Sequence, residues 1–343
     1  MVDIDSLVRE NIRRLIPYSC ARDEYKGESG IFLDANENPY GTLNRYPDPY
    51  QRRLKSAISR IKSVAEGNIF LGNGSDEIID LCFRAFCNPG KDKALSFMPS
   101  YGMYEVSSGI NDVRLVKIPL DNDFQIDLQA VEPHLDDPDL KLIFICSPNN
   151  PTGNSMDPSR VESIISGFRG IVVIDEAYID FAGQPSFLTL LDKYNNLIVM
   201  QTFSKAMGMA AVRVGMAFMD TSIVNIFNKL KPPYNISSIN QNAVLEAIRH
   251  NDSVLKKVER IRLERARLER NLKTLDIVEK VYPSDSNFLL VKTKDADLVY
   301  SFLAGKGIIV RNRNKMVPGC IRITVGTMRE NNALLKTMRQ IKI

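Results

Sequence analysis

The chain has 343 residues, of which 44% are hydrophobic and 25% charged, and 45 Lys and Arg against 41 Asp and Glu leave a net charge of +4. This balance argues against a disordered chain and against the strongly basic footprint of a dedicated nucleic-acid-binding protein. The two His residues are too few for a His-rich metal site and leave few candidates for a His-based catalytic triad, so no metal site is expected.

The N-terminus mixes acidic and basic residues without an apolar core, so we expect no signal peptide. No window approaches the roughly 18 continuous apolar residues of a membrane-spanning helix. The five cysteines are scattered and form no CxxC pattern, which indicates reduced thiols in a cytoplasmic protein.

Short apolar runs alternate with helical patterns over the first two thirds of the chain. The runs are apolar throughout, as in strands buried on both faces, and a helical face at 76–86 precedes the first of them. This order predicts an α/β domain with a mostly parallel sheet covered by helices. The predicted strands lie at 94–98, 113–118, 142–146, 171–174, 197–200 and 214–219.

The composition changes after about residue 247. A long charged amphipathic helix is predicted over 251–275, and its interleaved acidic and basic residues indicate a solvated face rather than a nucleic-acid-binding patch. Strand-like runs follow at 288–291, 308–310 and 321–325, with a helix between the first two. We therefore expect a large domain at 31–247 and a smaller α+β domain at 248–343.

Polar side chains fall at the carboxyl ends of the predicted strands, the edge where open α/β sheets bind ligands. The segment 72–77 offers glycines and helix N-terminal amides to an anion, although a plain helix start explains it equally well. Asp175 follows one strand and, taken alone, could equally cap a loop. Lys205 follows the next strand among small apolar residues, which disfavours a solvated lysine and suits an amine nucleophile. The rigid loop 147–153 could be only a turn, but its Asn150 could donate to a ligand.

Together these features supply what pyridoxal phosphate requires: a Schiff-base lysine, an acid for the ring nitrogen and an anion site for the phosphate. At these motifs the sequence resembles the fold-type I pyridoxal-phosphate aminotransferases, and within them the branch that acts on histidinol phosphate. The resemblance runs from Leu15 to Gly326. Its motifs are LDANENPYG (33–41), NRYPDPY (44–50), GNGSDE (72–77), PSYGMY (99–104), SPNNPTG (147–153), DEAYIDF (175–181), TFSKAMGMAAVRVG (202–215) and RITVGT (322–327).

The resemblance implies roles around the cofactor ring. Lys205 is expected to bind the cofactor covalently and then to act as acid and base. Asp175 is expected to pair with the pyridine nitrogen, and Tyr178 and Asn150 to hydrogen-bond the 3-oxygen of the ring. Tyr101 is expected to stack on the ring.

The resemblance also implies the anion sites and a homodimer. Tyr46 is expected to reach the cofactor phosphate of the neighbouring subunit, and an N-terminal arm at 1–30 to pack with the small domain and the partner. Arg322 is expected to bind the substrate α-carboxylate, Arg311 and Tyr18 its distal anion, and Asn36 to line the pocket. The residues expected at the cofactor phosphate within one chain are Ser75, Asp76, Thr202, Ser204 and Arg213.

The implied reaction is amino transfer between L-histidinol phosphate and 2-oxoglutarate, which gives imidazole-acetol phosphate and glutamate in histidine biosynthesis. A threonine-phosphate decarboxylase and an aromatic or broad-range aminotransferase remain alternatives, because they would share the cofactor and Lys205. A non-catalytic aminotransferase-like binding protein is disfavoured, since Lys205 and Asp175 are both retained.

Overall fold

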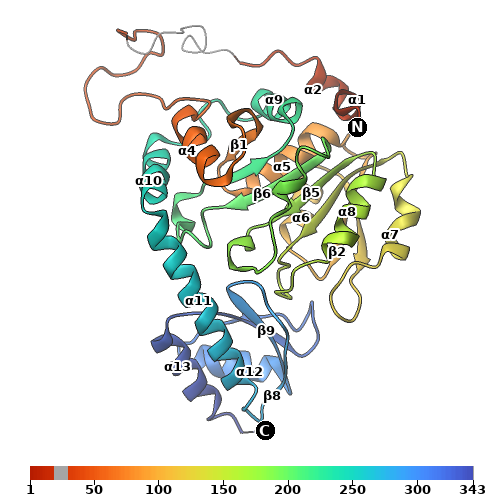
Figure 1. The fold of residues 1–343 in the computed structure, drawn as a ribbon, viewed down its shortest axis with the longest axis vertical. Helices are drawn as coiled ribbons and strands as arrows, with labels where there is room; N and C mark the ends of the chain where they lie inside the picture. The colour runs from red at the N-terminus through yellow and green to blue at the C-terminus, as the bar shows by residue number, and fades with distance from the viewer. Residues whose placement is uncertain (19–29, 343) are drawn as a thin grey trace.

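The computed structural model describes residues 1–18 and 30–342, which form a large domain, a small domain and an N-terminal segment (Figure 1). Helix α11 (Asn251–Leu272) runs along one side of the molecule and connects the two domains. The predicted boundary at 247/248 falls in the last turn of the preceding helix, α10 (Ser238–Arg249).

The large domain is built on a seven-stranded sheet with the strand order β1-β7-β6-β5-β4-β2-β3. Only β7 runs against the other six strands, so the mostly parallel sheet predicted from the sequence is confirmed. The strands are β1 (Ile69–Gly72), β2 (Lys93–Met98), β3 (Arg114–Pro119), β4 (Leu140–Cys146), β5 (Ile171–Asp175), β6 (Leu197–Thr202) and β7 (Gly215–Phe218).

Burial on both faces holds for the central strands but not for β3. Every residue of β5 and β6 is buried, because helices cover both sides of the sheet there. Strand β3 lies at the edge and buries only Ile118 fully, and its Lys117 forms an ion pair with Glu105 on the neighbouring helix. The expectation of an entirely buried strand at 113–118 was therefore wrong.

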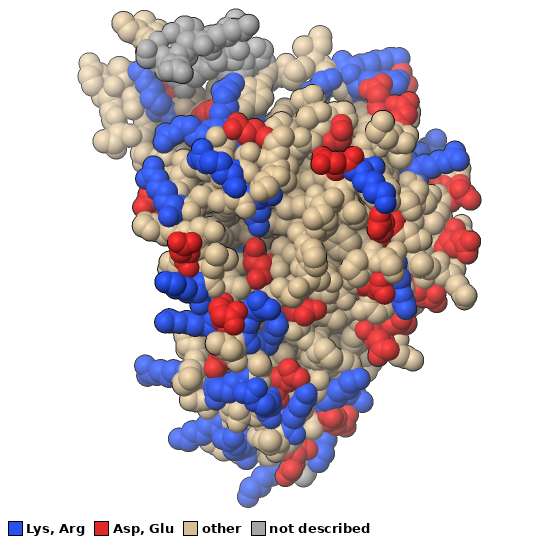
Figure 2. Space-filling view, viewed as in Figure 1, with Lys and Arg blue, Asp and Glu red and all other residues tan. Residues whose placement is uncertain are grey.

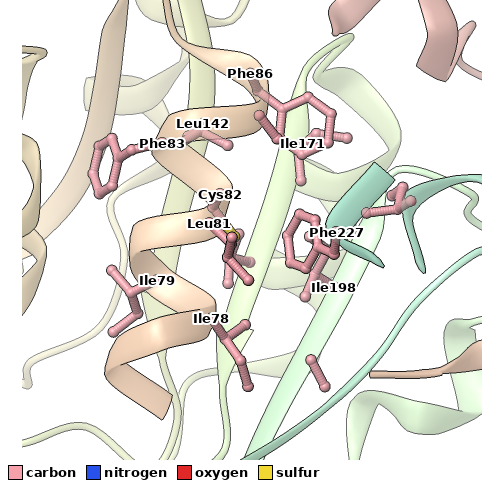
Figure 3. Close-up of a cluster of buried hydrophobic side chains, with 14 of the residues drawn as sticks. Ile78, Ile79, Leu81, Cys82, Phe83, Phe86, Leu142, Ile171, Ile198 and Phe227 are labelled. Atoms are coloured by element: carbon pink, nitrogen blue, oxygen red, sulfur yellow. The ribbon is translucent and has the colours of Figure 1, made fainter. Parts of the chain in front are cut away.

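Helices pack on the two faces of the sheet because alternate strand residues point to opposite sides. Figure 3 shows Phe83 and Phe86 of α5 packed with Leu142, Ile171 and Phe227 on one face. A second core, under α7 and α8, covers the other face. The helices of this domain are α4 (Arg52–Lys62), α5 (Ser75–Phe86), α6 (Met103–Ile110), α7 (Leu128–Leu135), α8 (Pro158–Gly167), α9 (Thr221–Leu230) and α10, with the short 3₁₀ helices η1 (Glu66–Asn68), η2 (Ile179–Phe181), η3 (Phe187–Leu190) and η4 (Ala210–Val212).

The small domain is an antiparallel four-stranded sheet of order β10-β11-β9-β8, with helices against it. This confirms the predicted α+β character, although the sequence reading missed β8 and placed β10 three residues too early. Figure 2 shows Lys and Arg interleaved with Asp and Glu over the region of α11. The elements are β8 (Val278–Val281), β9 (Phe288–Thr293), α12 (Ala296–Gly305), β10 (Arg311–Asn312), β11 (Cys320–Thr324) and α13 (Met328–Met338).

The first residues of the chain pack on the large domain, at the end opposite the small domain (Figure 1). Helices α1 (Ile4–Leu7) and α2 (Glu10–Arg13) contact α9, because Ile4, Val8 and Ile12 form a stripe at helical spacing that joins the core there. In this chain these residues pack on the large domain, and the predicted contact of the arm with the small domain stays a prediction. Contact with a partner subunit stays a prediction, and 19–29 lie outside the described residues.

Two expectations from composition can be compared with the described ranges. The cysteines there are free and buried, and they are Cys82, Cys87, Cys146 and Cys320, whereas Cys20 lies outside those ranges. No helix in the same ranges combines the length and the apolar character needed to cross a bilayer.

A close backbone approach fixes where α5 begins, and it yields the first prediction. A Cβ added at Gly215 of β7 would lie 2.6 Å from backbone atoms of Gly74 and Ser75. We expect Gly215→Ala to lower the free energy of unfolding by about 1–3 kcal/mol, as overpacking does. The matched control is Gly109→Ala in α6, where no heavy atom beyond the local helix lies within 4 Å of an added Cβ.

Urea denaturation followed by circular dichroism measures both variants. Gly109→Ala should be neutral or stabilising by up to about 1 kcal/mol, because alanine is the better helix former. Equal stability of the two variants would contradict the tight contact between β7 and the start of α5.

Candidate active site

A cavity of about 420 Å³ opens at the carboxyl ends of the parallel strands and is closed on one side by the small domain. The edge is the one predicted from the sequence, because parallel strands that end together bring their following residues together. Every residue predicted to bind the cofactor lines the cavity except Tyr46, and Arg311 and Arg322 line it from the small domain.

Asp175, the last residue of β5, supplies a buried carboxylate to this cavity. Its side chain is only 4% exposed. Oδ2 accepts a hydrogen bond of 2.9 Å from the Tyr104 hydroxyl, and Oδ1 accepts one of 3.0 Å from the Ala177 amide. Burial raises the pKa of Asp175, while these two donors act in the opposite direction and stabilise its charged form. The site therefore suits a cationic N–H partner.

Tyr104 is the residue at this carboxylate that sequence reasoning missed. It lies in α6, is fully buried and stacks on Phe144 of β4 with ring centroids 4.9 Å apart. Burial and the adjacent Asp175 raise the pKa of Tyr104 well above its ordinary value. The hydroxyl therefore stays protonated and donates a hydrogen bond to the carboxylate. The motif PSYGMY contains this tyrosine, but nothing in the sequence shows that its hydroxyl reaches the end of β5.

Lys205 brings an amine to the same cavity from the turn after β6. Its Nζ lies 5.6 Å from the ring centroid of Tyr178. Partial enclosure by the protein lowers the pKa of Lys205, and the nearby positive charge of Arg322 lowers it further. A larger fraction of this amine is therefore neutral at neutral pH than for a solvated lysine, as a nucleophile or base requires.

The start of α5 forms the anion-binding end of the cavity. Arg213 places Nη2 3.2 Å from Oδ2 of Asp76, and Tyr101 donates to Oδ1 of Asp76 at 3.1 Å. Gly74 precedes the helix, and a Cβ there would lie 2.4 Å from the guanidinium of Arg213. Glycine thus lets the guanidinium approach the free amides of the helix N-terminus. An arginine and helix amides together suit a phosphate group.

Two hydroxyl residues after β6 complete this end of the cavity. The backbone amide of Ser204 donates to Oγ1 of Thr202 at 3.1 Å, so the turn that carries Lys205 is held by its own side chain. Thr202 and Ser204 both line the cavity with Ser75 of α5. The structure thus brings together all five residues predicted for the cofactor phosphate within one chain.

Tyr178 and Asn150 lie where the two domains meet. Tyr178 is 6% exposed and packs edge to face on Phe288 of β9, with centroids 5.1 Å apart. Burial raises its pKa, so its hydroxyl keeps the proton. The Oδ1 of Asn150 accepts a hydrogen bond from Nη1 of Arg322, which links the 147–153 loop to the small domain. The predicted contacts of Tyr178 and Asn150 with the cofactor ring stay predictions.

Three arginines of the small domain face the cavity, and sequence reasoning missed Arg313. Arg311 pairs with Arg322 in the β10–β11 register, and the guanidinium of Arg322 lies over the Phe288 ring, 5.1 Å from its centroid. Burial lowers the pKa of Arg322, and burial with the two neighbouring arginines lowers the pKa of Arg313 to about 10. The alternation of Arg and Asn over 311–314 was the signal that could have identified Arg313, because alternate strand residues share a face.

Three predicted residues lie away from the cavity of their own chain. Tyr46 stacks on Tyr234 with centroids 4.4 Å apart and is half exposed. Tyr18 is 72% exposed and Asn36 is also exposed. All three lie before residue 47, and none of the described residues of that part of the chain, 1–18 and 30–46, lines the cavity. The predicted role of Tyr46 at the neighbouring subunit, and those of Tyr18 and Asn36 at the substrate, stay predictions.

Comparison with known proteins places the fold and the motifs in one family. Residues 25–338 match the family described as aminotransferase class I and II. The chain is 52% identical to a histidinol-phosphate aminotransferase of Cytophaga hutchinsonii over 98% of both chains. It is 49% identical to a protein of the same name from Parabacteroides distasonis over 100% of both.

Solved structures share the fold. A histidinol-phosphate aminotransferase of Sinorhizobium meliloti in complex with pyridoxal-5'-phosphate superposes with a TM-score of 0.80, at 24% identity over 89% of each chain. An L-threonine-O-3-phosphate decarboxylase of Porphyromonas gingivalis superposes with a TM-score of 0.73 at 19% identity, over 86% of this chain and 90% of that one. At these identities the likeness shows the fold alone.

The hydrogen bond between Tyr104 and Asp175 can be removed by a single substitution. Tyr104→Phe removes the hydroxyl that lowers the pKa of Asp175, so that pKa should rise further. A protonated Asp175 cannot balance a cation, so affinity for pyridoxal 5'-phosphate should be lost at higher pH than in the wild type. The shift should be about one to two pH units, since hydrogen bonds to charged groups contribute about 1.5–3 kcal/mol and one pK unit is about 1.4 kcal/mol.

Dissociation constants for pyridoxal 5'-phosphate, measured across pH, give the pH at which affinity is lost on the acid side. Tyr194→Phe is the control, because its hydroxyl also donates to a carboxylate, Glu162, but does not line the cavity. If Tyr104→Phe and the wild type lost affinity at the same pH, the hydrogen bond would not lower the pKa of Asp175.

Proposed function

This chain belongs to the class I and II aminotransferases, and we propose that it transfers an amino group between L-histidinol phosphate and 2-oxoglutarate, giving imidazole-acetol phosphate and glutamate in histidine biosynthesis. The observation that supports the proposal is that the two domains line one cavity with different sets of charged side chains. Asp175 and Lys205 lie on the large-domain side, and three arginines lie on the small-domain side. The first side suits amine chemistry on a cofactor and the second suits an anionic substrate.

Pyridoxal 5'-phosphate is the cofactor of this family, and the donor set on the large-domain side fits it. The amides at the start of α5 and the guanidinium of Arg213 would hold its phosphate, with the hydroxyls of Ser75, Thr202 and Ser204. Asp175 would hold the proton of the ring nitrogen. When bound, the cofactor supplies the electron sink that stabilises negative charge at the amine-bearing carbon of the substrate.

Lys205 would bind the cofactor and then move the proton at the amine-bearing carbon. A proton acceptor must be neutral before it accepts, and the enclosure and positive neighbours that lower the pKa of Lys205 favour that form. Tyr178 would orient the ring through its hydroxyl, which burial keeps protonated. Tyr101, fixed by its bond to Asp76, would pack against the ring.

The arginines would bind both substrates of the reaction in turn. Glutamate carries two carboxylates, whereas histidinol phosphate carries a phosphate ester and an imidazole. Arg322, already oriented by Asn150, would bind a carboxylate, and Arg311 would bind the second anion of glutamate or the phosphate. Arginine suits this exchange because its planar donors fit both anions.

We also propose a homodimer in which Tyr46 reaches the cofactor phosphate of the neighbouring subunit. The N-terminal segment supports this proposal, since Ile31 and Leu33 are at least 90% exposed and apolar side chains of this size are usually covered. Tyr18 would contact the distal anion of the substrate, and Asn36 would line the pocket. A cytoplasmic location stays a prediction of the sequence.

A product assay tests the reaction. The purified chain with pyridoxal phosphate, histidinol phosphate and 2-oxoglutarate should form glutamate, measured with a coupled glutamate dehydrogenase. Threonine phosphate in place of histidinol phosphate should release no carbon dioxide. Carbon dioxide from threonine phosphate, without glutamate from histidinol phosphate, would replace the proposal by the decarboxylase alternative.

Lys205 should be essential for turnover but not for folding. Lys205→Ala should reduce turnover to below about one thousandth of the wild type, because the loss of a general acid–base group alone costs about 10²–10⁴-fold. The thermal melting curve should remain cooperative, since Lys205 packs in no core. Lys91→Ala, on an exposed turn before β2, is the matched control and should keep full activity. Normal turnover by Lys205→Ala would refute the assignment.

A further inference from the structure

Along strand β10 and the turn after it, alternate side chains point toward helix α12 and toward the cavity. The amides of Asn312 and Asn314 donate to the two oxygens of Asp297 on α12, at 2.6 and 2.8 Å. Arg311 and Arg313 alternate with these asparagines and both line the cavity. Asp297 therefore holds the turn so that two arginines face the cavity on the same side of the chain.

Arg313 lines the cavity and its side chain is partly buried. Its backbone is fixed, since its amide donates to the Cys320 carbonyl at 3.0 Å and its carbonyl accepts from Val317 at 2.8 Å. Its Nε is buried and has no hydrogen-bond partner among the described residues. A buried donor without a partner is costly, and a bound anion would supply the missing acceptor.

The cavity is lined by more basic side chains than acidic ones. Arg213 forms an ion pair with Asp76, and Lys205 faces Asp175. No acidic side chain within residues 1–18 and 30–342 forms an ion pair with Arg311, Arg313 or Arg322. This cluster can therefore bind an anion with more than one negative charge.

We propose that Arg313 is a specificity-determining residue that binds, together with Arg311, the dianionic phosphate of the substrate. The proposal rests on the proposed function, because it concerns the phosphorylated substrate of that reaction. Two carboxylates of glutamate need one arginine each, which Arg322 and Arg311 supply. A phosphate ester near neutral pH carries almost two negative charges on one group, so it needs two cations at the same place. Arg313 is the second cation.

The experiment compares the two half-reactions in Arg313→Gln, because ping-pong kinetics give a separate kcat/KM for each substrate. The value for histidinol phosphate should fall about 10- to 100-fold, the range for a lost charge-assisted hydrogen bond. The value for glutamate should fall less than about threefold, because a single charge per carboxylate remains. Arg313→Lys, which restores the charge without the planar donors, should recover part of the loss.

A binding measurement accompanies the kinetics. Inorganic phosphate titrated into the holoenzyme by calorimetry should bind about tenfold or more weakly to Arg313→Gln than to the wild type. Lys315→Gln is the matched control, since it removes a positive charge from the same turn at an exposed position that does not line the cavity. It should change phosphate affinity and both half-reactions by less than about twofold.

The outcomes separate this proposal from the proposed function. Equal losses for both substrates in Arg313→Gln, or unchanged phosphate affinity, would overturn the role of Arg313 while leaving the reaction intact. A wild type that does not convert histidinol phosphate, but whose phosphate binding depends on Arg313, would overturn the reaction and support the phosphate site. If Arg313→Gln fails to fold, Arg313→Met takes its place, because it removes the charge and keeps an unbranched side chain. Wild-type affinity for phosphate and a wild-type ratio of the two half-reactions in that variant would overturn the proposal.

Discussion

The carboxylate of Asp175 is buried at the end of β5, and the architecture of the cavity follows from the need to stabilise its charge there. An isolated buried carboxylate is too costly to stay ionised. The Tyr104 hydroxyl and the Ala177 amide compensate it, and the amine of Lys205 contributes from across the cavity. Tyr104 can do so only because α6 packs its ring on Phe144, so the core beneath the sheet and the chemistry at its edge are coupled.

The cavity joins two surfaces with different charge balance. On the large-domain side Arg213 forms an ion pair with Asp76 and Asp175 accepts two hydrogen bonds, which suits a resident cofactor. On the small-domain side the arginines have no acidic partner among the described residues, which suits a substrate that arrives and leaves. Polar contacts connect the two sides close to the cavity, since the Asp285 amide donates to Gly153 at 2.7 Å and Arg322 donates to Asn150. These two contacts join the small domain to the 147–153 loop.

The sequence predicted what local patterns determine, and it missed what packing determines. Asp175 and Lys205 follow apolar runs, so their place at the sheet edge could be predicted. An apolar run does not encode direction, which is why the antiparallel β7 was not foreseen. The target of the Tyr104 hydroxyl depends on how α6 lies across the sheet, and the orientation of Arg313 depends on a turn fixed by α12. Tyr46 lies outside the cavity of its own chain, so no pattern within one chain can place it.

We propose that Asp175 stays ionised in the cavity and holds a proton on the ring nitrogen of the cofactor. The most direct measurement is the NMR resonance of that nitrogen in the enzyme loaded with isotope-labelled pyridoxal 5'-phosphate. We predict the chemical shift of a protonated pyridinium at neutral pH, persisting into mildly alkaline solution. A resonance of unprotonated pyridine at neutral pH would contradict the account.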